Sequence, residues 1–190
     1  MAADPVRRWR PRGDTTQGRI LWYSLRMETA RPPTLYLVCG KIAAGKSRLA
    51  RDLAARPATL LISEDHWMSN LFSGDLKTID DYRRFSARLR AAMGPHIVNL
   101  LQQGLSVVLD FPANTVSNRN WMRSLITQAD AAHELHFLDI PDTICRRRLR
   151  ERNARGEHPF VVNEAEYDLF TSYFVPPEPG EGFNVVVHTP

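Results

Sequence analysis

Short apolar runs alternate along the chain with longer segments in which apolar residues recur at helical spacing. The runs predict strands over residues 35–39, 59–62, 105–110, 135–140 and 184–187. Runs of this kind, without polar alternation, are typical of strands buried on both faces of a parallel sheet. Helical spacing predicts helices over 46–55, 79–103, 118–132 and 143–154, and Gly94-Pro95 is expected to break the second of them in two. The alternation indicates an α/β fold with a parallel sheet.

The N-terminal segment lacks this periodicity and carries the net charge of +4. Its first 34 residues hold seven arginines against three acidic residues, whereas the remainder holds as many acidic as basic side chains. We therefore predict a basic, flexible arm over 1–33 and one domain over 34–190. A chain that starts at Met27 should keep the fold, unless the arm belongs to the core. Alternatively, the positive charge of the arm could bind a polyanion.

Composition excludes several classes of protein. No apolar stretch of about 18 residues is present, so no membrane partner or membrane span is expected. Cys39 and Cys145 are too few for a disulfide framework and predict a reducing, cytoplasmic setting. Because the predicted domain is neutral, the sequence does not favour nucleic acid over a small molecule as the partner.

A glycine-rich loop follows the first predicted strand and opens the first predicted helix. It has the pattern Gly-x4-Gly-Lys-Ser, in which backbone N–H groups and the helix N-terminus together bind phosphate. Lys46 is expected to reach the β and γ phosphates of ATP, and Ser47 to bind Mg²⁺ together with Asp110 of the third strand. The predicted ATP-binding residues of this region are Gly40, Lys41, Ile42, Ala43, Ala44, Gly45, Lys46, Ser47 and Arg48.

Motifs of other phosphate-loop proteins are missing from the sequence, and this narrows the class. None of the three lysines lies in the Asn-Lys-x-Asp motif of a GTPase, and no Leu-Ser-Gly-Gly-Gln-like signature of a transporter ATPase is present. Motor ATPases place a water-activating glutamate after the acidic residue of the third strand, where this chain has Phe111. These absences leave a kinase that transfers the γ-phosphoryl group of ATP.

The segment Ser63-Glu64-Asp65 follows the second predicted strand, at the edge of a parallel sheet where ligands bind. A carboxylate there can accept the proton of an attacking hydroxyl, so we expect Asp65 to be the catalytic base. Two alternatives stay open from the residues alone. Asp65 could instead cap a following helix, or Glu64 could be the base.

An arginine-rich helix and a polar loop over 143–165 are typical of a mobile lid. Lid arginines bring positive charge to the transferred phosphoryl group when the lid closes. Arg148, Arg152 and Arg155 recur at helical spacing and can share one face. Arg147 and Arg150 are expected to face solvent.

Together these motifs resemble the small P-loop kinases that include zeta toxins, chloramphenicol phosphotransferase and the polynucleotide 5′-hydroxyl kinase domain. The similarity covers residues 35–188 and rests on the loop at 40–47, on 63–65, on 107–110 with Arg119, and on 151–155. It implies a P-loop NTPase fold, a three-layer α/β/α arrangement with a five-stranded parallel sheet in the order 2-3-1-4-5 and a helical lid. It also implies that Asp65 is the base and that Arg152 and Arg155 are catalytic lid residues. The resemblance further implies that Arg119 lies near the phosphates of ATP, and Arg148 of the arginine-rich helix is a further candidate for ATP binding.

The region between the second and third strands, about 67–104, is expected to form the acceptor pocket. Aromatic rings there can stack on a base or sugar, and arginines can hold an acceptor phosphate. A solvated helix with aromatic core residues is the alternative reading of the region. The candidate acceptor-binding residues are His66, Trp67, Tyr82, Arg83, Arg84 and Asn114.

These patterns predict an ATP- and Mg²⁺-dependent phosphotransferase whose acceptor is a hydroxyl of a small or nucleotide-like molecule. Two other functions stay open from the sequence. One is a regulatory switch that hydrolyses ATP and acts through a protein partner, and the other is a kinase of nucleic-acid 5′ ends. The neutral charge of the predicted domain makes the nucleic-acid kinase the less favoured of these.

Overall fold

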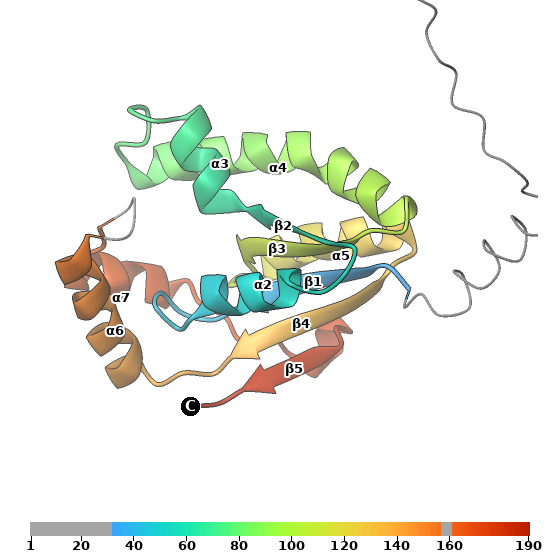
Figure 1. Cartoon of the computed structure of the whole chain (residues 1–190). Coiled ribbons are helices and arrows are strands. Elements are labelled where there is room, and N and C mark those ends of the chain that lie inside the picture. The colour runs from blue at the N-terminus through green and yellow to red at the C-terminus, as the bar shows by residue number, and fades with distance from the viewer. Residues whose placement is uncertain (1–31, 157–160) are drawn as a thin grey trace, which may run out of the picture. The chain divides into compact units, whose positions relative to one another are not determined.

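The computed structural model describes residues 32–156 and 161–190 (Figure 1), so the predicted arm lies almost entirely outside the described residues. Among the helices of the described ranges, none is long and apolar enough to cross a membrane. The described elements, in chain order, are β1 (Thr34–Cys39), α2 (Lys46–Ala54), β2 (Thr59–Ser63), α3 (Glu64–Leu71), α4 (Ile79–Gln102), β3 (Ser106–Pro112), α5 (Val116–Ala129), β4 (Ala132–Leu138), α6 (Asp142–Arg155), α7 (Glu164–Ser172), the 3₁₀ helix η1 (Pro179–Glu181) and β5 (Val185–His188).

The strands of this part of the chain run parallel in one five-stranded sheet, in the order β2-β3-β1-β4-β5. The predicted strand order is confirmed. Because the strands are parallel, their carboxyl ends lie at the same edge, where Cys39 pairs with Phe137 and Ser63 pairs with Asp110. The segments that follow β1, β2 and β3 therefore converge at this edge.

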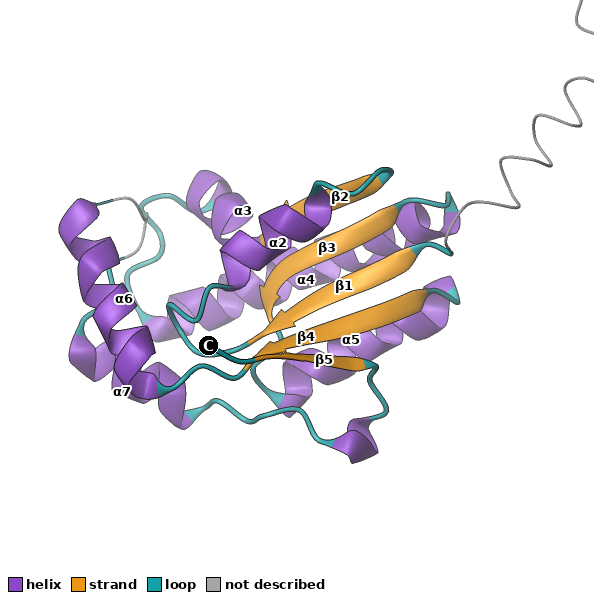
Figure 2. Cartoon of the chain, turned by 60° about the horizontal axis from the view of Figure 1, so that its bottom comes forward, coloured by secondary structure: helices purple, strands orange, loops and turns teal. Residues whose placement is uncertain are grey.

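Helices cover both faces of the sheet in a three-layer arrangement, with α2 on one face and α4 and α5 on the other (Figure 2). Along β1, Leu35 and Leu37 pack toward α4 and α5, and Tyr36 and Val38 pack toward α2. All four side chains are buried, as the continuous apolar run predicts. The predicted α/β/α architecture is confirmed.

The strand β2 lies at an edge of the sheet, as the predicted strand order requires, but its burial differs from the prediction. Leu60 and Leu61 are 42% and 39% exposed, so the run at 59–62 is not buried on both faces as expected. Within β2, Ile62 is the residue that joins the core. A short apolar run does not distinguish an edge strand from a central one, since its neighbours are set by the topology and not by the run itself.

The helix α4 continues without a break through Gly94-Pro95, contrary to the predicted division into two helices. A proline inside a helix removes one backbone hydrogen bond, but the apolar residues before and after it remain packed in the core. Gly94 is buried where α4 packs on α5. A Cβ at Gly94 would lie 3.6 Å from Leu125 Cδ2 and 3.8 Å from Trp121 Nε1. These are ordinary van der Waals distances, so Gly94 lies at the contact of α4 with α5 and does not end the helix.

Two helices at the carboxyl edge, α3 and α7, are not among the predicted elements. The N-cap of α3 is Ser63, whose hydroxyl accepts a hydrogen bond from the backbone N–H of His66. The helix α7 begins at a capping box, in which Asn163 and Glu166 each bond to the backbone N–H of the other. The lid predicted at 143–165 thus comprises most of α6, a segment that includes 157–160 outside the described residues, and the start of α7.

Ion pairs hold α6 against α7. Arg146 pairs with Glu164 at 2.6 Å and with Asp168, and its guanidinium lies 4.4 Å from the centroid of the Tyr167 ring. Arg150 pairs with the same Glu164 at 2.8 Å, although its side chain is 69% exposed. Arg150 is therefore largely in solvent, as predicted, and it also joins the two helices.

A buried histidine on β4 makes the stability of the fold depend on pH. His136 Nδ1 lies 2.9 Å from His188 Nε2, and His136 Nε2 lies 3.1 Å from Glu134 Oε2. Burial lowers the pKa of His136; Glu134 opposes this effect, and the charges of His188 and Arg56 add to it. Since a histidine of the unfolded chain titrates at about pH 6.5, the unfolded state binds more protons than the folded state as the pH falls through that value. We expect the melting temperature to decrease between about pH 7 and about pH 5 for this reason.

Thermal unfolding of three proteins at both pH values measures this contribution. His136→Gln cannot titrate and should show a smaller decrease than the wild type. His96→Gln alters an exposed histidine of α4 and should keep the decrease of the wild type. The same decrease in His136→Gln and the wild type would show that His136 does not cause it.

Candidate active site

The segment between β1 and α2 has the backbone conformation of a phosphate-binding loop. Gly40 and Gly45 have φ values of 149° and 113°, in the region that favours glycine. At Gly40 a Cβ would lie 3.0 Å from the carbonyl oxygen of Leu138, so a larger residue would push the loop away from β4. Because α2 begins at Lys46, directly after the loop, its N-terminal N–H groups face the space that the loop encloses.

The other residues of the loop pack against the lid helix α6. Ala44 is buried, and Ile42 and Ala43 are half-buried, in an apolar cluster that includes Leu149 of α6. Arg148 of α6 donates a hydrogen bond from Nη1 to the carbonyl oxygen of Ala44 at 3.0 Å. Arg148 therefore lies beside the phosphate loop, and its contact with ATP stays a prediction.

The Lys46 side chain folds over its own loop. Its ammonium donates hydrogen bonds to the carbonyl oxygens of Gly40 at 2.7 Å and Lys41 at 2.8 Å. Burial lowers the pKa of Lys46, and the carboxylates of Asp110 and Asp65 oppose this effect. The ammonium is thus bonded to the backbone of its own loop and is influenced by the charge of two carboxylates. In a loop of this kind the lysine reaches the β and γ phosphates.

Asp110 and Ser47 form the candidate magnesium site. Burial raises the pKa of Asp110, a hydrogen bond with Ser47 opposes this, and the nearby Asp65 raises it further. Among the described residues, no group of three His, Cys, Asp or Glu side chains could hold a metal ion without other ligands. Mg²⁺ commonly binds through one or two carboxylates together with the phosphates of the substrate, and Ser47 and Asp110 fit this role.

Asp65 lies in the first turn of α3, directly beyond the edge of the sheet. The helix is capped by Ser63, so the alternative in which Asp65 serves as the cap is not what the structure shows. The carboxylate of Asp65 acts on the pKa values of Lys46, Asp110 and Arg152, which come from three other elements. Asp65 therefore lies within electrostatic influence of the phosphate loop, of Asp110 in β3 and of α6.

Arg152 is the lid residue that reaches this group of charges. Its Nε and Nη2 atoms are buried, and no hydrogen-bond partner for either occurs in the described part of the chain. Burial lowers the pKa of Arg152, and the Asp65 carboxylate opposes this effect. Because a buried polar group without a partner costs stability, its presence is typical of a functional site. Arg155 is exposed near the end of α6, where its Nε lies 3.3 Å from the carbonyl oxygen of Glu151, and its catalytic role stays a prediction.

One contact between the loop and the lid is missing from the sequence-based expectations. The ammonium of Lys41, expected at the phosphates, pairs with the carboxylate of Asp142 in the first turn of α6. This hydrogen bond lowers the pKa of Asp142, and the Tyr167 hydroxyl of α7 lies 3.4 Å from the same carboxylate. The available signal was the acidic residue directly after Pro141, a position where negative charge stabilises a helix N-terminus.

Asn114 belongs to the phosphate loop and not to the acceptor side, which corrects the expectation. Its Oδ1 accepts a hydrogen bond from the backbone N–H of Gly40 at 2.9 Å. Its carbonyl oxygen accepts one from the N–H of Val175 at 2.9 Å. Asn114 therefore holds the first glycine of the loop and links it to the C-terminal segment.

Replacing Asn114 by alanine should weaken ATP binding. The Gly40 N–H would lose its acceptor, so the loop would lose about 1–3 kcal/mol of local stabilisation that ATP would have to restore on binding. We expect the Kd for ATP, measured by calorimetry, to rise about fivefold or more. Asn120→Ala, which alters an exposed residue of α5, is the control. An unchanged Kd for ATP in Asn114→Ala, with a raised KM for the acceptor, would restore the original expectation.

Arg119 is fully buried and is not available to the nucleotide, contrary to expectation. Its Nε and Nη2 atoms pair with Glu181 at 2.5 Å and 2.8 Å, and Nη1 donates to the carbonyl oxygens of Ala113 and Val175 at 2.9 Å and 2.8 Å. Nη2 also donates to the carbonyl oxygen of Pro176 at 3.3 Å. All of its N–H groups are therefore used within the protein, and they fix the C-terminal segment to α5.

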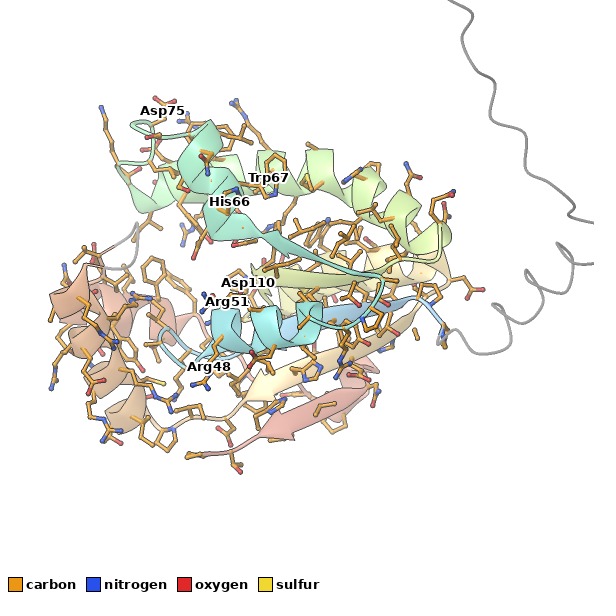
Figure 3. The ribbon with its side chains drawn as sticks, in the orientation of Figure 1. Arg48, Arg51, His66, Trp67, Asp75 and Asp110 are labelled. Atoms are coloured by element: carbon orange, nitrogen blue, oxygen red, sulfur yellow. The ribbon has the colours of Figure 1, made fainter. Side chains whose placement is uncertain are left out.

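His66 and Trp67 are exposed on α3 at the carboxyl edge (Figure 3), and both stay candidates for acceptor binding. Figure 3 also shows Arg48, which lies on α2. Arg48 is exposed on the first turn of α2, and its contact with ATP stays a prediction.

The other predicted acceptor residues lie on α4. Tyr82 is not available for stacking, because it packs against the core and its hydroxyl donates to Glu64 at 2.8 Å. This corrects the expectation for Tyr82 and also shows that Glu64 points away from the phosphate loop, toward α4. Arg83 and Arg84 are each 57% exposed and pair with aspartates three residues earlier, so their role in acceptor binding stays a prediction.

Comparison with known proteins agrees with this architecture. The family model described as "AAA domain" matches residues 35–177. No curated protein matches the chain. A kinase candidate from Chloroflexus aurantiacus is 22% identical with a TM-score of 0.67, and the match covers 84% of this chain and 86% of that one.

Two further solved structures contain bound nucleotides or their analogues. Kti12 from Chaetomium thermophilum, in complex with ADP-AlF3, is 15% identical with a TM-score of 0.64, over 82% of this chain and 88% of that one. The APS kinase CysC from Mycobacterium tuberculosis, in complex with AMPPNP and APS, is 20% identical with a TM-score of 0.56, over 84% and 90%. The family model covers most of the sequence, and these solved structures share the fold of the chain. The chain therefore belongs to the AAA domain family and has the fold of the small P-loop kinases.

Proposed function

We propose that this protein transfers the γ-phosphoryl group of ATP to a hydroxyl of a small or nucleotide-like acceptor, with Asp65 as the base. The position of Asp65 carries the proposal. The charge of its carboxylate raises the pKa values of Lys46 in the phosphate loop, of Asp110 and of Arg152 in α6. A carboxylate in these surroundings can accept the proton of a hydroxyl that attacks the γ-phosphate.

Each residue of the site has a role in this reaction. The backbone N–H groups of the loop and the Lys46 ammonium bind the phosphates of ATP. Ser47 and Asp110 would hold Mg²⁺, which supplies charge neutralisation for the phosphate oxygens when bound. Asp65 orients the acceptor hydroxyl and accepts its proton late, because the phosphoryl group passes through a loose transition state. Arg152 donates hydrogen bonds to the oxygens of the transferred group.

A small acceptor is favoured over a nucleic-acid end. Binding of a nucleic acid depends on lysine and arginine side chains that neutralise phosphates. The exposed Arg83 and Arg84 of α4 are already paired with aspartates, and the predicted domain has no net charge. His66 and Trp67 offer a polar and an aromatic surface beside Asp65 instead.

A regulatory ATPase is the second candidate function, and contacts between the loop and the lid favour it. Lys41 pairs with Asp142, and Arg148 bonds to Ala44, so α6 is joined directly to the nucleotide-binding loop. Such contacts could transmit the state of the nucleotide to a partner bound at the lid. If the chain has this second function, it would hydrolyse ATP without an acceptor, and a bound partner would change the rate of hydrolysis.

A transfer screen separates the two functions. The protein is incubated with Mg²⁺ and γ-labelled ATP in the presence of sugars, nucleosides, amino acids, antibiotics with free hydroxyls, or short oligonucleotides with 5′-hydroxyl ends. We expect label to appear in at least one small hydroxyl compound. Label that appears in inorganic phosphate alone, whatever compound is added, would support the regulatory ATPase. Label in the oligonucleotides alone would support the nucleic-acid kinase.

A further inference from the structure

Glu64, the residue before Asp65, is held in a buried polar network. Its side chain is 1% exposed and accepts hydrogen bonds from Ser86 Oγ at 2.5 Å and from the Tyr82 hydroxyl at 2.8 Å. Arg90 Nε lies 3.7 Å from Glu64 Oε1. Burial raises the pKa of Glu64, and all three partners oppose this effect by favouring the charged carboxylate. Both carboxylate oxygens of Glu64 therefore accept hydrogen bonds from other side chains of the protein.

The three partners of Glu64 come from a single face of α4. Tyr82, Ser86 and Arg90 are spaced four residues apart, so they form one stripe along the helix. Ser86 is fully buried, and the hydroxyl of Ser86 also accepts hydrogen bonds from Nε and Nη2 of Arg90, at 3.2 Å and 2.7 Å. The stripe therefore binds Glu64 as one connected group.

The network continues from α4 to the strand that carries Asp110. Arg90 Nη1 donates to Asn118 Oδ1 of α5 at 2.6 Å, and Asn118 Nδ2 donates to the carbonyl oxygen of Pro112 at 2.9 Å. Pro112 lies two residues after Asp110 in β3. An unbroken chain of polar contacts thus joins the first turn of α3 to the end of β3.

We infer that Glu64 is a positioning residue, whose bonds to α4 hold the first turn of α3 so that Asp65 faces the phosphate loop. This role rests on the proposed function of Asp65 as the base. Glu64 and Asp65 are consecutive residues of a helix, so their side chains leave it about 100° apart, and a fixed direction for one fixes the other. A buried network with all its members bonded is rigid, and a displacement of about 1 Å at a reacting group can lower a rate about a hundredfold.

Glu64→Gln tests this role with a side chain of the same size. The amide replaces one acceptor oxygen with a donor, so either Ser86 or Tyr82 loses its acceptor, and Arg90 loses the nearby negative charge. We expect the turnover of γ-labelled ATP, with water as the acceptor, to fall about tenfold to a hundredfold. The KM for ATP should be unchanged, because the hydrogen bonds of Glu64 run to α4 and not to the phosphate loop. Glu134→Gln, on β4, is the control and should keep the turnover of the wild type.

A double-mutant cycle with Asp65→Asn separates positioning from a general effect on the fold. If Glu64 acts through Asp65, then Glu64→Gln should lower turnover in the wild type but not in Asp65→Asn. The variant Tyr82→Phe removes one hydrogen bond to Glu64 and should show the same dependence on Asp65 with a smaller effect. This second cycle decides the question if Glu64→Gln does not fold.

The possible failures of these proposals are distinguishable. Turnover of Asp65→Asn within about threefold of the wild type would overturn the proposed function of Asp65, and the role of Glu64 with it. Suppose instead that Asp65→Asn has a low turnover and that adding Glu64→Gln lowers it further, by the same factor as in the wild type. This result would overturn the positioning role of Glu64 alone. So would Glu64→Gln turnover equal to that of the wild type.

Discussion

Replacing Asp65 by asparagine should lower phosphoryl transfer by about two to four orders of magnitude while ATP still binds. Asparagine keeps the size of the side chain and removes the charge that accepts the proton. The cap of α3 is Ser63, so the substitution leaves the helix start intact, and the melting temperature should change little. Transfer to the acceptor that the screen identifies, together with the Kd for ATP, measures both parts of this prediction.

The control for this substitution is Asp75→Asn. Asp75 is exposed after α3, and its loss should change neither transfer nor ATP binding. If Asp65→Asn transfers phosphate within about threefold of the wild type, then Asp65 is not the base. If it loses ATP binding as well, then its carboxylate serves the phosphate loop and not the acceptor.

Replacing Arg152 by lysine should lower turnover about a hundredfold or more, with a much smaller change in ATP affinity. The guanidinium can donate two parallel hydrogen bonds to phosphoryl oxygens, and an ammonium cannot reproduce this geometry. The buried Nε and Nη2 atoms, without a partner in the described part of the chain, are the donors that the phosphoryl oxygens would engage. Single-turnover kinetics and calorimetry measure the two effects separately.

A substitution to methionine distinguishes catalysis from structure at the same position. A buried, unpartnered charge costs stability, so Arg152→Met should melt at the same temperature as the wild type or higher, and should still lose turnover. Arg147→Lys is the control, since Arg147 is 69% exposed and pairs weakly with Glu151. A marked decrease in the melting temperature of Arg152→Met would mean that Arg152 holds the lid together and does not serve the reaction.

The strands and the phosphate loop could be predicted from sequence because their signals are local. A continuous apolar run that ends in Gly40, then Gly45-Lys46-Ser47 and a helix, place the whole signature of the loop within a short stretch of sequence. The exposure of the side chains of β2 could not be predicted from a local signal of this kind. Leu60 and Leu61 read as buried residues, and only the order of the strands shows that they lie at the border of the sheet.

The break predicted at Gly94-Pro95 shows how tertiary packing overrides a local signal. In an isolated helix these two residues would favour an interruption. Here the apolar face of α4 stays in the core on both sides of Pro95, and Gly94 is buried where α4 packs on α5. The capping box of α7, by contrast, was readable at Asn163 and Glu166, since the two residues have the required spacing.

The role of a site residue could not be predicted where its partner lies far away along the chain. Asn114 bonds to a residue 74 positions away, and Arg119 pairs with Glu181, which is 62 positions away. The sequence motifs point to both residues but not to their roles, because the partner that defines the role of each lies outside any local motif. The role of Tyr82 is likewise set by a partner outside any local motif, because its hydroxyl donates a hydrogen bond to Glu64.

The partition of the γ-phosphoryl group between acceptor and water tests the proposed reaction most directly. Wild-type protein is mixed with Mg²⁺ and γ-labelled ATP in a single turnover, with and without the acceptor found in the screen. We expect the acceptor to increase the rate of ATP consumption and to carry most of the label, and Asp65→Asn to abolish both effects while it still binds ATP. Label that appears only in inorganic phosphate, at a rate that the acceptor does not change and that Asp65→Asn retains, would contradict a kinase that uses Asp65 as its base.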